Sequence, residues 1–121
     1  MKRLLLDQSA PRGLKTVLTG YDISTAREMG WAEISNGDLL AAAEAAGFAI
    51  LVTADQSIPF QNNLSGRRIA IISLTTNHWD TVRPVTDRVQ QACDAARDSD
   101  YVVVEFPKPP RRRRPRPGPA P

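Results

Sequence analysis

The sequence lacks the features of a disulfide-bonded, secreted or membrane-spanning protein. It contains one cysteine, Cys93, so an intrachain disulfide and a cysteine-based metal site are excluded. No apolar run approaches the roughly 20 residues of a membrane span, and the run at residues 4–6 is far shorter than the apolar core of a signal peptide. We therefore expect a cytoplasmic protein with no membrane partner.

Basic residues are scarce outside one terminal segment. Residues 107–121 hold six of the 16 lysines and arginines and no acid, which leaves 10 basic and 13 acidic residues in positions 1–106, a net charge of −3. The isoelectric point near 9.5 therefore describes the tail, and it does not indicate a nucleic-acid-binding body. The tail also holds seven of the ten prolines, so we expect it to be disordered or polyproline-like.

Five apolar segments have the composition of strands, and helix-like patterns separate them. We expect strands at residues 3–6, 21–24, 48–53, 69–74 and 101–106. We expect helices between residues 9 and 20, over 25–29, from 35 to 46 and from 80 to 96, with a further helical turn near 60–64. This alternation predicts an α/β fold, a three-layer α/β/α sandwich with a mostly parallel sheet of about five strands, in one domain over residues 1–106.

Four polar side chains are expected to cap these helices. Ser9 precedes a helix with a proline in its first turn, and Asp80 precedes the last helix. Thr25 has Glu28 three residues later, which is the spacing of a capping box, and Ser35 has an acid at the same spacing. Each cap would satisfy backbone N–H groups that a helix leaves unpaired at its start.

Two of the expected strands run into an aspartate. The first ends at Asp7, and the third ends at Thr53 and is followed by Ala54 and Asp55. Right-handed connections place both ends at one edge of a parallel sheet, and Asp38, at the start of the helix that leads into the third strand, should face the same edge. Carboxylates brought together repel each other unless a cation or a shared proton compensates. We therefore expect a divalent metal site formed by Asp7, Asp38 and Asp55.

Each of these acids also has a structural explanation. Asp7 can cap the helix that follows it, and Asp55 can be a turn residue. Asp38 stands three residues after Ser35, at the position of a capping-box carboxylate, which accounts for it as well as a metal does. The metal interpretation depends on the edge that the three acids are expected to share.

The order of these motifs resembles the PIN superfamily of metal-dependent ribonucleases, and more closely a short PIN-like branch related to the VapC toxins of bacterial toxin–antitoxin pairs. That branch opens with a motif of the type Leu-Leu-Asp-Glu-Asn-Leu-Pro, and residues 5–11 read Leu-Leu-Asp-Gln-Ser-Ala-Pro. Residues 36–40, Asn-Gly-Asp-Leu-Leu, match its helix-opening acidic step, and residues 51–55, Leu-Val-Thr-Ala-Asp, match its Leu-Val-Thr-x-Asp strand end. Residues 75–79, Thr-Thr-Asn-His-Trp, are also similar, so the resemblance covers residues 2–106.

The resemblance implies a compact α/β/α fold and an Mg²⁺- or Mn²⁺-dependent endoribonuclease whose catalytic, metal-binding acids are Asp7, Asp38 and Asp55. We expect Asp7 and Asp55 to bind the ion directly or through water, and Asp38 to orient a metal-bound water. Thr53 and Asn77 are candidate contacts to water or substrate, although a turn or cap also explains Asn77. The expected role is the toxin of a type II toxin–antitoxin pair, with an RNA substrate, a small DNA-binding antitoxin as partner, and a homodimer or a toxin–antitoxin hetero-oligomer as the assembly.

Two departures from the family pattern support an alternative. Gln8 replaces the acid that often follows the first aspartate, and Ser57 stands where many PIN proteins have another acid. A chain with fewer acids binds a second metal more weakly, so the alternative is a catalytically weak or inactive module that binds a protein or RNA. A receiver-like phosphoacceptor domain also gathers aspartates at strand ends, but Gln8 and Lys108 fit its acidic pair and its terminal lysine poorly.

Three further features have two explanations each. Trp79 can stack on an RNA base or cover the sheet edge. His78, the sole histidine, can be a general base or a surface loop residue. The arginines of the tail can bind RNA with strong salt dependence or be a solvated extension without a role.

Overall fold

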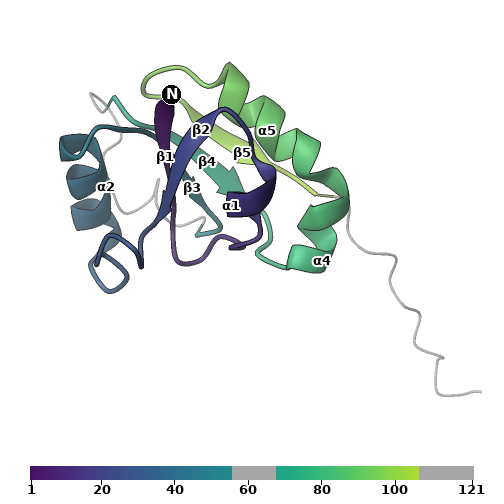
Figure 1. The fold of residues 1–121 in the computed structure, drawn as a ribbon, viewed down its shortest axis with the longest axis horizontal. Coiled ribbons are helices and arrows are strands. Elements are labelled where there is room, and N and C mark those ends of the chain that lie inside the picture. Colours follow the sequence, from purple (N-terminus) through teal and green to yellow (C-terminus); the bar gives the residue numbers. More distant parts are fainter. Residues whose placement is uncertain (56–67, 107–121) are drawn as a thin grey trace, which may run out of the picture.

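Five parallel strands form one sheet in the computed structural model of the chain, which describes residues 1–55 and 68–106 (Figure 1). The strands are β1 (Lys2–Leu6), β2 (Tyr21–Thr25), β3 (Phe48–Thr53), β4 (Ala70–Leu74) and β5 (Tyr101–Val104), in the order β2-β1-β3-β4-β5. Every pair of neighbouring strands is parallel. The predicted α/β class, with a parallel sheet of five strands, is confirmed.

The sheet has an apolar cluster on each of its faces. Side chains alternate between faces along a strand, so Leu4 and Leu6 of β1 belong to one cluster and Leu5 to the other. The first cluster includes residues of α1 (Leu14–Val17), α4 (Trp79–Val82) and α5 (Thr86–Ala95), and the second includes residues of α2 (Asn36–Ala45). The central strands β1, β3 and β4 are therefore buried on both faces, as their continuous apolar runs predict.

Two of the expected caps are present, although only one opens a helix. Ser35 is the N-cap of α2, and its Oγ accepts a hydrogen bond from the Asp38 N–H at 3.2 Å. Thr25 and Glu28 form the reciprocal bonds of a capping box, from Thr25 N to Glu28 Oε1 at 2.9 Å and from Glu28 N to Thr25 Oγ1 at 3.1 Å. The predicted helix over residues 25–29 is a turn that ends at Gly30, whose φ of +80° is easily reached only by glycine.

The other two predicted caps are wrong. Gly13 is the N-cap of α1, and the Ser9 hydroxyl bonds elsewhere. His78 is the N-cap of α4, and Asp80 lies in its first turn. The expected single helix over residues 80–96 is divided into α4, a 3₁₀ segment over Arg83–Val85 and α5, because Pro84 lacks the N–H that a continuous helix needs. The expected turn at 60–64 and the tail lie outside the described residues.

The order of the strands reverses at β1, and we call the carboxyl ends of β1 and β3 the switch point of the sheet. The connection from β1 leads through α1 to β2 on one side, and the connection from β2 leads through α2 to β3 on the other side. In open parallel sheets, ligands bind in the crevice outside the carboxyl ends of the strands where this reversal occurs. The fold therefore points to the carboxyl ends of β1 and β3, where Asp7 and Asp55 follow. Among the helices of residues 1–55 and 68–106, none has the length and apolar composition to cross a bilayer.

Candidate functional site

Asp7 lies directly after β1 and is held by the backbone on both sides. Its N–H donates to Val52 O of β3 at 2.9 Å, which extends the pairing of the two strands by one bond. Its carbonyl accepts a bond from Ala10 N at 2.9 Å, which turns the chain away from the sheet. The Asp7 side chain is thus presented at the carboxyl edge of the sheet, between β1 and β3.

Two hydroxyl groups converge on one oxygen of the Asp7 carboxylate. Ser9 Oγ and Thr53 Oγ1 each donate to Asp7 Oδ2 at 2.8 Å. Ser9 Oγ in turn accepts from Ala54 N at 2.9 Å, and Thr53 Oγ1 accepts from Asp55 N at 3.0 Å. Each hydroxyl has one proton, and both hydroxyls donate theirs to Asp7. The 3.1 Å distance between Ser9 Oγ and Thr53 Oγ1 is therefore a contact and not a third hydrogen bond.

This network fixes the orientation of Asp7. Two backbone N–H groups at the end of β3 polarise two hydroxyls, and both hydroxyls bond the charged carboxylate, which is the stronger kind of hydrogen bond. Asp7 Oδ1 receives no hydrogen bond from the described residues. The described residues therefore bond one oxygen of the carboxylate twice and leave the other without a hydrogen bond.

Ser9 is a site residue for which the sequence pattern predicts a different role. The pattern predicts a helix cap, but Ser9 links the end of β1 to the end of β3 through its hydrogen bonds with Asp7 and Ala54. The spacing Asp-x-Ser after a strand could have indicated this bond, because a serine hydroxyl can reach the carboxylate of an aspartate two residues earlier. Thr53, a candidate contact to water or substrate, is fully buried and donates its hydroxyl proton to Asp7. Its predicted contact to water or substrate stays a prediction.

Asp38 is exposed in the first turn of α2, the helix that enters the structure at the edge where β1 ends (Figure 1). Its N–H bonds the Ser35 cap, but its carboxylate makes no hydrogen bond or ion pair with the described residues. The capping explanation therefore accounts for the backbone of Asp38 and not for its charge.

Asp7, Asp38 and Asp55 are not grouped as three ligands of one metal ion in the described part of the chain. Among residues 1–55 and 68–106, no group of three or more His, Cys, Asp or Glu side chains is placed to hold one ion. Mg²⁺ nevertheless needs only one or two protein carboxylates, since waters complete its octahedron. The donor set at the switch point, all oxygen and anchored on Asp7, has the chemistry that such a hard cation prefers. Asp55 lies two residues beyond Thr53 and is half-buried.

Ser73 is a second buried hydroxyl near this edge. It pairs in register with Thr53 across β3 and β4, and both side chains are 0% exposed. Ser73 Oγ has no hydrogen-bond partner among the described residues. A buried hydroxyl without a partner costs roughly 1–3 kcal/mol, so this position is a point of local strain beside the network.

The connection from β4 to α4 contributes less to the site than its motif predicts. Asn77 and His78 are exposed, and neither side chain bonds the Asp7 network. Trp79 packs against the apolar cluster and lies on Gly13, where a Cβ atom would come within 2.5 Å of its Cζ2. Of its two explanations, the structure favours the one in which Trp79 covers the sheet edge. The predicted contact from Asn77 stays a prediction, and Ser57 lies outside the described residues.

A basic pocket adjoins Asp7. It has a volume of about 410 Å³ and is bounded by the end of β1, the segment around α1 and the turn after β2. Within it, Lys15 Nζ lies 2.6 Å from Glu28 Oε2, and this hydrogen bond is the main cause that lowers the pKa of Glu28 below its usual value. The lining residues are Leu6, Asp7, Gln8, Arg12, Lys15, Thr25, Arg27 and Glu28.

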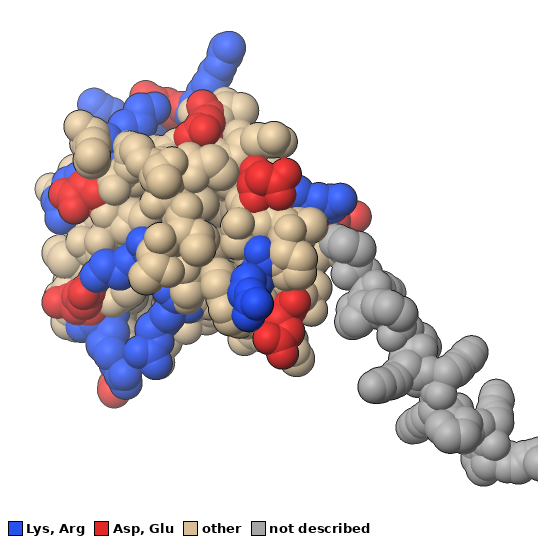
Figure 2. All heavy atoms as spheres, turned by 45° about the vertical axis from the view of Figure 1, so that its right-hand side comes forward, with Lys and Arg blue, Asp and Glu red and all other residues tan. Residues whose placement is uncertain are grey.

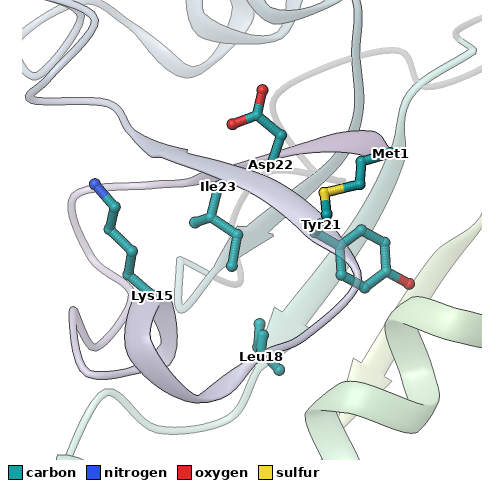
Figure 3. A pocket seen from close by; sticks show the side chains of 6 residues that line it. All are labelled: Met1, Lys15, Leu18, Tyr21, Asp22 and Ile23. Atoms are coloured by element: carbon teal, nitrogen blue, oxygen red, sulfur yellow. The ribbon is translucent and has the colours of Figure 1, made fainter.

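A second hollow lies along β2, away from the carboxyl ends of β1 and β3 (Figure 3). It has a volume of about 540 Å³, and Tyr21 at its rim points toward α5, where its hydroxyl donates to Asp94 Oδ1 at 2.6 Å. Partial burial and this bond raise the pKa of Tyr21. The tyrosine thus joins β2 to α5. The lining of the hollow includes one acid, Asp22, and one base, Lys15. We assign no chemistry to it.

Comparison with protein-family models, with curated proteins and with solved structures gave no match for this chain.

Proposed function

We propose that the protein is a PIN-like endoribonuclease that depends on Mg²⁺ or Mn²⁺. One observation carries the proposal: a single carboxylate, Asp7, is fixed at the switch point of a parallel sheet by two hydroxyls that bond only one of its oxygens. This arrangement restricts the side chains of Ser9 and Thr53, because both hydroxyls must point at the same oxygen of Asp7. It is the arrangement expected where a carboxylate must bind a cation in a defined direction.

We propose a role for each of the three acids. Asp7 and Asp55 would hold the ion, directly or through water, and the exposed carboxylate of Asp38 would orient a water at the same edge. When bound, the ion activates a water and offsets charge on the phosphate. Ser9 and Thr53 hold Asp7 in place, and the Thr53 hydroxyl does so from a fully buried position. Asn77 is proposed as a contact to water or substrate.

The biological role that we propose follows from the resemblance to PIN-like toxins. The protein would be the toxin of a type II toxin–antitoxin pair, with the three-layer α/β/α arrangement of that family. A small DNA-binding antitoxin would cover the carboxyl edge, and the toxin would form a homodimer or a hetero-oligomer in the cytoplasm. An adjacent short reading frame that encodes a DNA-binding protein, and co-purification of the two products, would test this role.

The nuclease itself is tested by Asp7→Asn, which keeps the shape of the side chain and removes its charge. We expect it to abolish Mn²⁺-dependent cleavage of a single-stranded RNA. Asp98→Asn is the matched control, because Asp98 is exposed, lies after α5 at the opposite edge of the sheet, and loses the same charge. Full cleavage by Asp7→Asn, or equal loss in both variants, would show that the site is assigned wrongly.

A second candidate function is a non-catalytic module that binds RNA or a protein. The observation that favours it is the lack, among residues 1–55 and 68–106, of a group of three acids able to hold an ion. Calorimetric titration with Mn²⁺ separates the two candidates. Binding that is lost in Asp7→Asn supports the nuclease, and no binding at millimolar metal supports the module.

The strand order also occurs in receiver-type doubly-wound domains. Those domains need a second acid beside the first aspartate, and Gln8 occupies that position. We therefore do not propose phosphoacceptor chemistry.

A further inference from the structure

The basic pocket beside Asp7 has an uneven balance of charge. Lys15 and Glu28 neutralise each other at 2.6 Å, and Glu28 also accepts the Thr25 N–H at 2.9 Å. Arg12 and Arg27 are exposed on the other lining segments and form no ion pair with the described residues. Apart from the Lys15–Glu28 pair, the lining of the pocket therefore has two positive charges, on Arg12 and Arg27, and one negative charge, on Asp7.

Both arginines are placed by rigid local structure. Arg12 lies in the tight turn before α1, where its carbonyl accepts Lys15 N at 3.0 Å. Arg27 lies in the turn after β2 that the Thr25–Glu28 box closes, and its carbonyl accepts Gly30 N at 3.1 Å. Both turns follow the carboxyl end of a strand, β1 for Arg12 and β2 for Arg27. Figure 2 shows Lys and Arg side chains in the lower left of the visible face, with Asp and Glu side chains among them. The backbone of both arginines is therefore fixed at the carboxyl edge of the sheet, where the two residues line the pocket.

We propose that this pocket binds a backbone phosphate of single-stranded RNA through Arg12 and Arg27, next to the phosphate that is cleaved at Asp7. The pocket volume of about 410 Å³ is sufficient for a nucleotide-sized ligand. Guanidinium groups bond phosphate oxygens in pairs, which sets the position of the strand as well as attracting it. The negative charge of Asp7 keeps the bound phosphate on the arginine side of the pocket. The inference rests on the proposed nuclease for its substrate, but its binding step needs no metal.

The test measures binding of a short fluorescein-labelled oligouridylate to the full chain in EDTA, where no cleavage can occur. The variant is Arg12→Gln/Arg27→Gln, and the matched control is Arg68→Gln/Arg97→Gln. The control removes the same charge from exposed side chains that precede β4 and β5, at the opposite edge of the sheet. All proteins retain the arginine-rich tail, so its contribution to binding is the same throughout.

We expect Arg12→Gln/Arg27→Gln to weaken RNA binding about tenfold and to reduce the salt slope by about 0.7, because one phosphate of the strand is no longer neutralised by the protein. The control should bind RNA as the unmodified chain does, and thermal unfolding should be the same for all three. Equal weakening in both variants, or none in either, would overturn the inference. If the arginine variant no longer binds inorganic phosphate or uridine monophosphate while its RNA affinity is unchanged, the inference is also overturned, because the pocket then takes a small anion.

Failure of this inference is distinguishable from failure of the nuclease. If Asp7→Asn keeps full cleavage and the arginine variant still binds RNA weakly, the site of hydrolysis is wrong and the phosphate pocket stands. If Asp7→Asn abolishes cleavage and the arginine variant binds RNA normally, the nuclease stands and the pocket is wrong.

Discussion

The hydroxyl pair formed by Thr53 and Ser73 allows a sharp test of the site architecture that does not depend on catalysis. The two residues are register neighbours on β3 and β4 and are equally buried. Thr53 donates to Asp7 Oδ2 at 2.8 Å and accepts from Asp55 N at 3.0 Å. Ser73 Oγ has no partner within the described part of the chain. Removal of the Thr53 hydroxyl should therefore lower the stability of the protein, and removal of the Ser73 hydroxyl should not.

Thr53→Val replaces the hydroxyl by a methyl group of similar size. It removes a hydrogen bond to a carboxylate, which contributes about 1.5–3 kcal/mol, and it leaves the Asp55 N–H without this acceptor. Since Asp55 is half-buried, part of the second cost is recovered from water. We expect the free energy of unfolding to fall by about 2–4 kcal/mol, a large share of the roughly 5–15 kcal/mol typical of a domain.

Ser73→Ala is the matched control. It removes a buried hydroxyl that makes no hydrogen bond to the described residues, at the cost of a small void. We expect the free energy of unfolding to stay unchanged or to rise by about 1 kcal/mol. Urea unfolding followed by far-UV circular dichroism measures both variants, and the midpoint of Thr53→Val should fall by about 1–2 M at an unchanged slope. A drop in stability in Ser73→Ala as large as that in Thr53→Val would refute the assigned network.

Two further predictions concern the packing of α1 and α5. Gly13→Ala should lower the free energy of unfolding by about 1–3 kcal/mol, because its Cβ would lie 2.5–2.7 Å from three ring atoms of Trp79, and Trp79→Phe in the same chain should recover part of the loss; a Gly13→Ala chain as stable as the original would refute the contact. Cys93 is buried, and burial raises the pKa of its thiol to about 12, so a thiol reagent at pH 8 should leave the native chain unmodified and label one thiol in denaturant.

The parts of the fold that could be predicted from the sequence are those set by local physics. The continuous apolar runs of β1, β3 and β4 predict strands buried on both faces, and these strands are at the centre of the sheet. Ser35 caps α2 as predicted, because a serine oxygen before a helix has few better partners than the nearby N–H groups. The edge position of Asp7 also follows from local pattern, because the strand ends at the first charged residue after its apolar run.

The errors arise where a distant group competes with a local one. Ser9 has the sequence position of a helix cap, but the Asp7 carboxylate and the Ala54 N–H offer it stronger bonds, and Ala54 is 45 residues away. Pro84 interrupts the last helical region although the apolar stripe continues through Val82 and Val89, since the stripe reports burial and not backbone continuity. Thr25 and Glu28 form their box without a helix, because the box closes a turn as well as it opens a helix.

The location of the site has two independent supports, and they have different consequences. The acids of the sequence predict a site at Asp7 and Asp55, whereas the strand order predicts one outside β1 and β3 without reference to any side chain. The second support would hold even if no metal bound, because every open parallel sheet has a crevice where its order reverses. The hydrogen-bond network adds what topology cannot, since two hydroxyls and two backbone N–H groups are committed to the orientation of one carboxylate. A carboxylate that only ended a strand would not need four hydrogen bonds to fix its orientation. The hydrogen-bond network, rather than the number of acids, is therefore the strongest argument that Asp7 binds a ligand.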